Sequence, residues 1–135
     1  MKVEHLQPAT LFDSQPFEFA QVVTVEGARR TIYCAGQTAM AKDLAVIGPG
    51  DYAQQAEEAY RNVALALAAA GATPADVVFL RNYVVGYNPG HIELINQARR
   101  KAWGAHEFPA ATLLGVAALA LPELLIEVEA IAVIG

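Results

Sequence analysis

Hydrophobic and polar positions near the start of the chain follow the pattern of β-strands. Residues 17–25 and 31–35 are rich in Val, Ile, Phe and Tyr, and the turn residues Glu26-Gly27-Ala28-Arg29 separate them. Two such runs around a short glycine-containing turn predict a β-hairpin. We therefore expect residues 17–25 and 31–35 to pair with each other.

The middle of the chain carries the spacing of two helices with a strand between them. Apolar residues recur every three or four positions over 56–70, after a candidate cap at Asp51 and before a stop at Gly71. A second helix is expected after Asn88-Pro89, with its end at Gly104. The mostly apolar run over 76–87 predicts a strand between the helices.

Two further strands are expected at the end of the chain, over 110–119 and 124–134, around a turn at Pro122. The whole order predicts one α+β domain over residues 1–135, with a mixed sheet and two helices on one face. In the last strand the even positions from Ile126 to Ile134 are all apolar, which suits the face under the helices. The odd positions are also mostly apolar, so we expect the other face to associate with further copies and to form sites between subunits.

Composition narrows the class of protein. The chain is 55% hydrophobic and only 17% charged, with a net charge of −5, and no apolar run reaches the ~20 residues that a bilayer requires. We expect a cytoplasmic protein without membrane contact, and the acidic charge argues against nucleic acid as a partner. The single cysteine, Cys34, excludes an intrachain disulfide, and the three scattered histidines show no metal-ligand spacing.

Candidate chemistry centres on a few charged residues. Glu127 and Glu129 share one face of the last expected strand, where they either divide acid and base roles or accept hydrogen bonds from neighbouring groups. Arg81 interrupts an apolar strand, which indicates either an ion pair with a glutamate or a site for a substrate anion. Arg99 lies near the end of the second helix, where a cation complements the helix dipole. Cys34 lies in an apolar strand and is expected to be a buried, unreactive thiol.

Several short segments, taken together, resemble one known family over about residues 16–134. They are Ala35-Gly36-Gln37, the helix end Ala69-Ala70-Gly71, Asn96, Phe108-Pro109-Ala110 and Glu127-Val128-Glu129-Ala130-Ile131-Ala132. This set resembles the Rid family (YjgF, reactive intermediate deaminase). The resemblance implies a chorismate-mutase-like α+β fold assembled as a homotrimer, with a central barrel and ligand clefts between subunits.

Archetypal Rid proteins hydrolyse enamines and imines such as 2-aminoacrylate, and the resemblance assigns roles to positions of this chain. Glu127 matches the glutamate that positions the hydrolytic water, and Asn96 matches a helix asparagine. The family arginine that binds the substrate carboxylate is replaced by Ala111. A tyrosine, a serine and a cysteine of the family are replaced by Phe19, Ala35 and Leu113.

These replacements predict a site that is more apolar than the family's. Loss of a charged partner typically costs several kcal/mol of binding, so 2-aminoacrylate is not the expected substrate. Gly36 and Gln37 are expected to line the cleft. Its apolar walls are expected to be Phe19, Leu113 and Leu114. Arg81 or Arg99 is the candidate for a relocated anion contact.

The resulting hypothesis is a divergent Rid enzyme for a small imine-, enamine- or carbonyl-type metabolite, with Glu127 as acid or base and Asn96 as an orienting group. No cofactor is expected. The alternative is a non-catalytic homotrimer with a small-molecule-binding or regulatory role, which binds a small apolar metabolite or a partner protein. Some family members have been labelled ribonucleases, but the acidic charge argues against RNA binding here.

Overall fold

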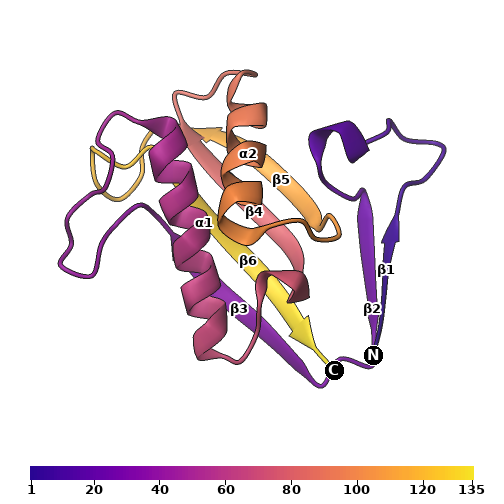
Figure 1. Cartoon of the computed structure of the whole chain (residues 1–135). Helices are drawn as coiled ribbons and strands as arrows, with labels where there is room; N and C mark the ends of the chain where they lie inside the picture. The colour runs from indigo at the N-terminus through magenta and orange to yellow at the C-terminus, as the bar shows by residue number, and fades with distance from the viewer.

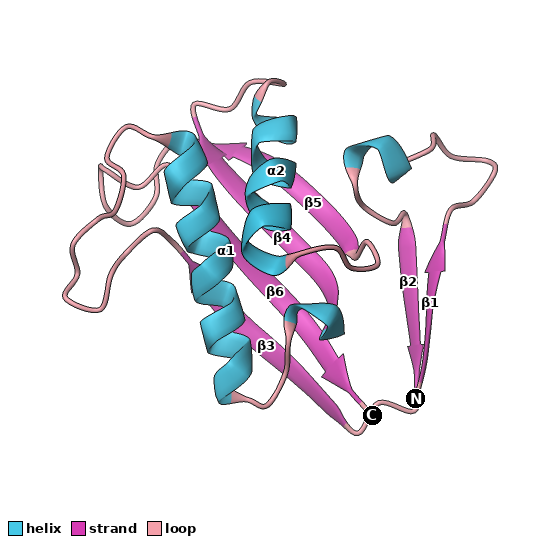
Figure 2. Cartoon of the chain, viewed as in Figure 1, coloured by secondary structure: helices cyan, strands magenta, loops and turns pink.

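Four strands form the main sheet and two helices cover one of its faces, in a computed structural model that describes all 135 residues (Figures 1 and 2). The strands are β3 (Arg30–Gln37), β4 (Val77–Val85), β5 (Ala110–Val116) and β6 (Ile126–Ile134). The helices are α1 (Tyr52–Ala69) and α2 (His91–Trp103). The strand order is β3-β6-β4-β5, with β4 and β5 parallel and the other pairs antiparallel. The expected α+β class with a mixed sheet under two helices is confirmed.

The core lies between β6 and α1. Ile126 and Val128 are completely buried on the face of β6 under the helices, and Val63 and Leu67 of α1 pack in the same cluster. The alternate residues of β6 from Glu127 to Ile131 are only half-buried. The opposite face of the sheet is therefore open within one chain, as the alternation along the strand predicts.

Both helices end where local signals predict. The Asp51 carboxylate accepts a hydrogen bond from the backbone N–H of Gln54 (3.0 Å), which caps α1, and the chain leaves that helix through Gly71 at φ +76°. Helix α2 ends at Trp103, before Gly104, as expected, but it begins at His91 rather than at Pro89. The Asn88 side chain accepts a hydrogen bond from Gly90 N–H (2.8 Å) and holds a turn before the helix.

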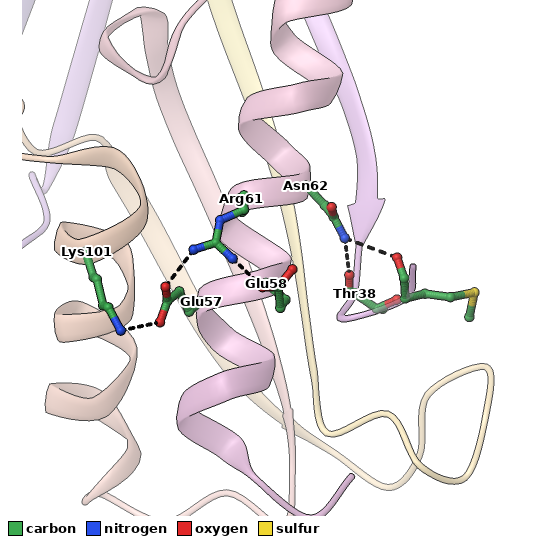
Figure 3. A network of polar contacts seen from close by, with 7 residues as sticks. Thr38, Glu57, Glu58, Arg61, Asn62 and Lys101 are labelled. Atoms are coloured by element: carbon green, nitrogen blue, oxygen red, sulfur yellow. Dashed lines mark hydrogen bonds and ion pairs between the residues drawn. The ribbon is translucent and has the colours of Figure 1, made fainter. Parts of the chain in front are cut away.

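Polar contacts also fasten α1 to its surroundings (Figure 3). Glu57 of α1 forms ion pairs with Lys101 of α2 (3.0 Å) and with Arg61 (2.7 Å). Hydrogen bonding from Lys101 is the main cause that lowers the pKa of Glu57. The Asn62 amide donates to the backbone oxygen of Thr38 (2.8 Å) and so holds the segment that follows β3.

The expected hairpin between residues 17–25 and 31–35 is wrong. Strand β2 (Val22–Glu26) pairs with β1 (Lys2–Leu6) as a separate two-stranded sheet, and β3 pairs with β6 instead. Residues 15–17 form a short 3₁₀ helix because Pro16 and a left-handed Glu18 (φ +62°) interrupt the extended run. Figure 1 shows the β1–β2 hairpin standing apart from the four-stranded sheet.

The other strand boundaries shift by a few residues. Strand β5 stops at Val116, three residues before the expected end, and β6 begins at Ile126 rather than 124. The intervening residues form a bend and turn around Pro122, which has no N–H to donate to a sheet. None of the helices has the length and apolar character needed to cross a membrane.

Candidate functional site

A pocket of about 460 Å³ lies between α2, the middle of β4, the start of β5, and the segment that joins β1 to β2. Seven of its twelve lining residues are hydrophobic. The lining residues are Phe12, Phe17, Glu18, Phe19, Asn82, Ile92, Ile95, Asn96, Arg99, Ala111, Thr112 and Leu113. The volume falls in the range typical of sites for small organic ligands.

Three phenylalanines from the segment between β1 and β2 form an aromatic wall of the pocket. The ring of Phe12 meets those of Phe17 and Phe19 edge to face, with ring centroids 6.2 and 6.1 Å apart. Ser14, which is fully buried, anchors this segment through a hydrogen bond between its hydroxyl and the Phe19 carbonyl (2.6 Å). The wall is thus built by local contacts within the segment.

Two side chains of α2 hold the aromatic segment against the helix. The Asn96 amide donates to the carbonyl of Phe17 (3.1 Å), and Arg99 Nη2 donates to the carbonyl of Glu18 (2.7 Å). The Glu18 carboxylate forms an ion pair with Arg100 on the same helix. Polar contacts therefore join helix α2, which lines one side of the pocket, to the aromatic wall.

Arg99 brings a positive charge into this apolar pocket. Its residue is only 8% exposed, yet no carboxylate forms an ion pair with it, because Arg100 engages the nearby Glu18. A guanidinium has five N–H donors, and the hydrogen bond to the Glu18 carbonyl is the one that the chain provides. A buried charge without a counter-ion is costly, so the pocket is suited to an anionic ligand group.

A buried network lies behind Arg99. The Tyr60 hydroxyl donates to Asn82 Oδ1, and the Trp103 indole N–H donates to the Tyr60 carbonyl (2.7 Å). Burial raises the pKa of Tyr60 to about 12, so its phenol is neutral at physiological pH. The Asn82 amide nitrogen makes no hydrogen bond within the chain and is a second polar donor at the pocket.

The pocket gathers five of the residues that sequence reasoning named for the site. They are Phe19, Asn96, Arg99, Ala111 and Leu113. Ala111 and Leu113 pair with Leu80 and Asn82 across the parallel ladder and face the same side of the sheet as the helices. Ala111, where the resemblance expects the family arginine, thus lies in the same pocket as Arg99.

The other named residues lie away from this pocket. Ala35, Gly36 and Gln37 are at the end of edge strand β3, where the Gln37 amide donates to the Ala35 carbonyl (3.2 Å). Leu114 is 42% exposed and points to the opposite side from Leu113, its neighbour in β5.

Arg81 forms an ion pair with Glu129, its partner in the β4–β6 ladder. The Tyr83 hydroxyl also donates to Glu129 (2.6 Å), and hydrogen bonds from Tyr83 and Arg81 lower the pKa of that carboxyl. Of the two readings of Arg81, the structure therefore shows the ion pair. The group lies on the open face of the sheet, half-exposed rather than buried.

Glu127 also lies on the open face, but its carboxylate makes no hydrogen bond or ion pair within the chain. It rests against the backbone of Gly36, where a Cβ atom would stand only 2.7 Å from Glu127 Oε1. Asn96 lies across the sheet on the helix side. Glu127 and Asn96 therefore do not meet within one chain, and a common site would need a second copy.

Sequence reasoning missed several pocket residues. Phe12, Phe17 and Glu18 were not singled out, although three phenylalanines within eight residues of a polar segment were a usable signal. Ile92 and Ile95 were expected only as apolar helix positions.

Cys34 is 9% exposed, and burial raises the pKa of its thiol, as for an unreactive cysteine.

Comparison with known proteins agrees with this architecture. The model of the family described as Endoribonuclease L-PSP matches residues 14–134. The Rid-family protein YyfB from Yersinia pestis is 38% identical and superposes with a TM-score of 0.90 over 99% of this chain and 100% of its own. No curated protein sequence matches the chain.

Two further solved structures are more distant. RidA from the Antarctic bacterium Psychrobacter is 25% identical, with a TM-score of 0.68 over 86% of this chain and 88% of its own. Rv2704 from Mycobacterium tuberculosis, of the YjgF/YER057c/UK114 family, is 28% identical, with a TM-score of 0.62 over 98% and 100% of the two chains. The chain therefore belongs to the Endoribonuclease L-PSP family, the family of the Rid proteins.

Proposed function

We propose that this protein acts on a small imine-, enamine- or carbonyl-type metabolite that has an apolar body and a carboxylate, and that 2-aminoacrylate is not its substrate. The observation that carries the proposal is the buried Arg99, which faces an apolar pocket without a carboxylate partner. An anionic end on the ligand would supply the missing counter-charge.

Arg99 rather than Arg81 is proposed as the relocated anion contact. Arg99 lines the same pocket as Ala111, so a guanidinium from α2 reaches the site that has lost its arginine on β5. Arg81 is on the opposite face of the sheet and already pairs with Glu129. A carboxylate bound by Arg81 would have to displace that glutamate.

The size and lining of the pocket favour a branched or aromatic ligand. The three phenylalanine rings and the apolar side chains of Ile92 and Ile95 leave about 460 Å³. A three-carbon molecule such as 2-aminoacrylate buries little apolar area in such a space, whereas each additional buried CH₂ contributes about 0.8 kcal/mol. The pocket therefore suits a larger metabolite.

Catalysis is proposed to depend on assembly. Glu127 has a free carboxylate on the open face of the sheet, so in a homotrimer it is available to the cleft of a neighbouring copy. There it would transfer a proton or position a water molecule, with Asn96 as an orienting group.

A second candidate is a non-catalytic binding protein. The observation that favours it is that Glu18 is the only carboxylate lining the pocket, and that it is paired with Arg100. No free acid or base within the chain is therefore in reach of a ligand there. A Glu127 variant in the assembled protein separates the two candidates, as described below.

The ligand class is tested by calorimetric titration with two stable 2-oxo acids, 4-methyl-2-oxopentanoate and pyruvate. We expect the branched acid to bind more tightly, and Arg99→Met to weaken it by about tenfold or more, since a charge-assisted hydrogen bond contributes about 1.5–3 kcal/mol. The matched control is Arg81→Met, which removes the same charge from the opposite face and should leave binding unchanged. Equal affinity of Arg99→Met and the parent protein would contradict the proposal.

A further inference from the structure

The β1–β2 hairpin and strand β3 both have an unused pairing edge. Strand β2 pairs with β1 alone, and β3 pairs with β6 alone. No other backbone hydrogen bond reaches the outer edge of either strand. An isolated two-stranded sheet is marginally stable in water, and an open edge strand invites pairing with another chain.

The connection between these two strands is three residues long, from Gly27 to Arg29. Such a short connection normally folds back into an antiparallel hairpin. Here Gly27 has a left-handed φ of +71° and the strands diverge, so that β2 lies far from the edge of its own β3 (Figure 1). The pairing that the sequence pattern predicts is thus available only to β2 of a different copy.

The hairpin is held in its displaced position by contacts with its own chain. Ala20 donates its N–H to the carbonyl of Pro109 (2.9 Å), and the His5 ring bonds to the carbonyl of Phe108 (2.7 Å). The hydrogen bonds from Asn96 and Arg99 to the aromatic segment add to these contacts. A return of the hairpin to its own β3 would break them and dismantle the pocket wall.

The superpositions support the displaced position. Residues 1–26 are about a fifth of the chain, so a TM-score of 0.90 with YyfB requires these residues to overlay too. The match to the Psychrobacter RidA covers only 86% of the chain, with a TM-score of 0.68. The hairpin position is therefore shared with YyfB.

We infer that the β1–β2 hairpin is exchanged between copies: β2 of one subunit pairs antiparallel with the open edge of β3 in a neighbouring subunit. We take the register of this pairing from the residues that flank the loop, with Glu26 opposite Arg30. Val23 then lies opposite Tyr33. Glu26 has no ion pair within the chain, and Arg30 bonds only to the Ala70 carbonyl, so their charges are free to pair. Tyr33, at 78% exposed, would be covered.

Each contact joins two different surfaces, β2 of one copy and the edge of β3 of another. Copies can therefore exchange hairpins reciprocally as a dimer, close as a larger ring or continue as a fibre. It would also place each aromatic pocket wall on an element that a second subunit holds in place.

The test mixes two single-cysteine chains, Val23→Cys and Tyr33→Cys, each with Cys34→Ser. The chains are unfolded, refolded together and oxidised. Exchange predicts a covalent dimer of one chain of each kind, which disappears on reduction. The matched control is Thr24→Cys in place of Val23→Cys, because residue 24 points to the other side of the strand and should give far less dimer.

The result that overturns exchange is no dimer between the two kinds of chain. In a single chain carrying both Val23→Cys and Tyr33→Cys, return of the hairpin to its own β3 would instead give an intrachain disulfide, which peptide mass spectrometry identifies. If either variant fails to fold by circular dichroism, Val25→Cys and Thr31→Cys provide a second pair in the same register. Ligand binding by Arg99 does not enter this test.

Discussion

At the residue scale, Arg81 and Arg99 lie in different environments, on opposite faces of the sheet. Arg81 and Arg99 were equal candidates for an anion contact. Pairing between β4 and β6 places Arg81 beside Glu129. Residues 12–19, in contrast, pack against α2 and bury Arg99 beside a pocket. The resemblance places the family arginine at Ala111, which can be read from the sequence. The choice of Arg99 rather than Arg81 as the proposed replacement required the structure.

Glu129 gives a pH-dependent prediction. Hydrogen bonds from Tyr83 and Arg81 lower its pKa in the folded protein below the ordinary 4.5, so the stabilisation is fully present above that pH and is lost as the pH falls through the folded pKa. We expect Glu129→Gln to lower the melting temperature at pH 7 and to make it less dependent on pH below 5. Thermal unfolding between pH 3 and 7 measures this. Glu123→Gln, an exposed control, should retain the parental slope.

Glu127 gives the opposite expectation for stability. Its carboxylate has no partner within the chain, so Glu127→Gln should change the free energy of unfolding by less than about 0.5 kcal/mol. Under the enzymatic proposal the same variant loses turnover of the imine substrate while ligand affinity is retained. A large loss of stability with unchanged turnover would assign Glu127 a structural role instead.

At the element scale, the helices were predictable because their signals are local. The cap at Asp51 and the stops at Gly71 and Gly104 act within one turn of the chain. The hairpin was mispredicted because strand pairing depends on non-local partners. Strand β1, a short alternating run from Lys2 to Leu6, was overlooked as the partner of β2.

The cap of α1 can be tested alone. Asp51→Ala removes the acceptor for the Gln54 N–H and should lower the free energy of unfolding by about 1 kcal/mol. Asp51→Asn retains an acceptor oxygen and should cost much less. Urea unfolding at neutral pH compares the two variants, and equal losses would show that the cap is not the source of the stability.

At the scale of the whole molecule, the sequence predicted an open sheet face, and the structure leaves that face uncovered within one chain. Tyr33 and Leu114 are exposed on it, and Glu127 has no partner there. What covers the face could not be derived from local patterns, because we expect the covering contacts to lie between copies. We expect homotrimers at micromolar concentration in sedimentation equilibrium, and monomers would contradict the account of assembly.

The most direct test of the proposed function measures release of ammonia and 2-oxo acid from reactive intermediates generated in the assay, the leucine imine by an amino-acid oxidase and 2-aminoacrylate by dehydration of serine. The substrates are the imine of leucine and 2-aminoacrylate, with an arginine-containing Rid protein as the positive control. We expect hydrolysis of the leucine imine above background, at least tenfold slower hydrolysis with Arg99→Met, and no enhancement for 2-aminoacrylate. The account is contradicted if the leucine imine stays at background, or if 2-aminoacrylate is hydrolysed within about tenfold of the control, a barrier difference of only about 1.4 kcal/mol.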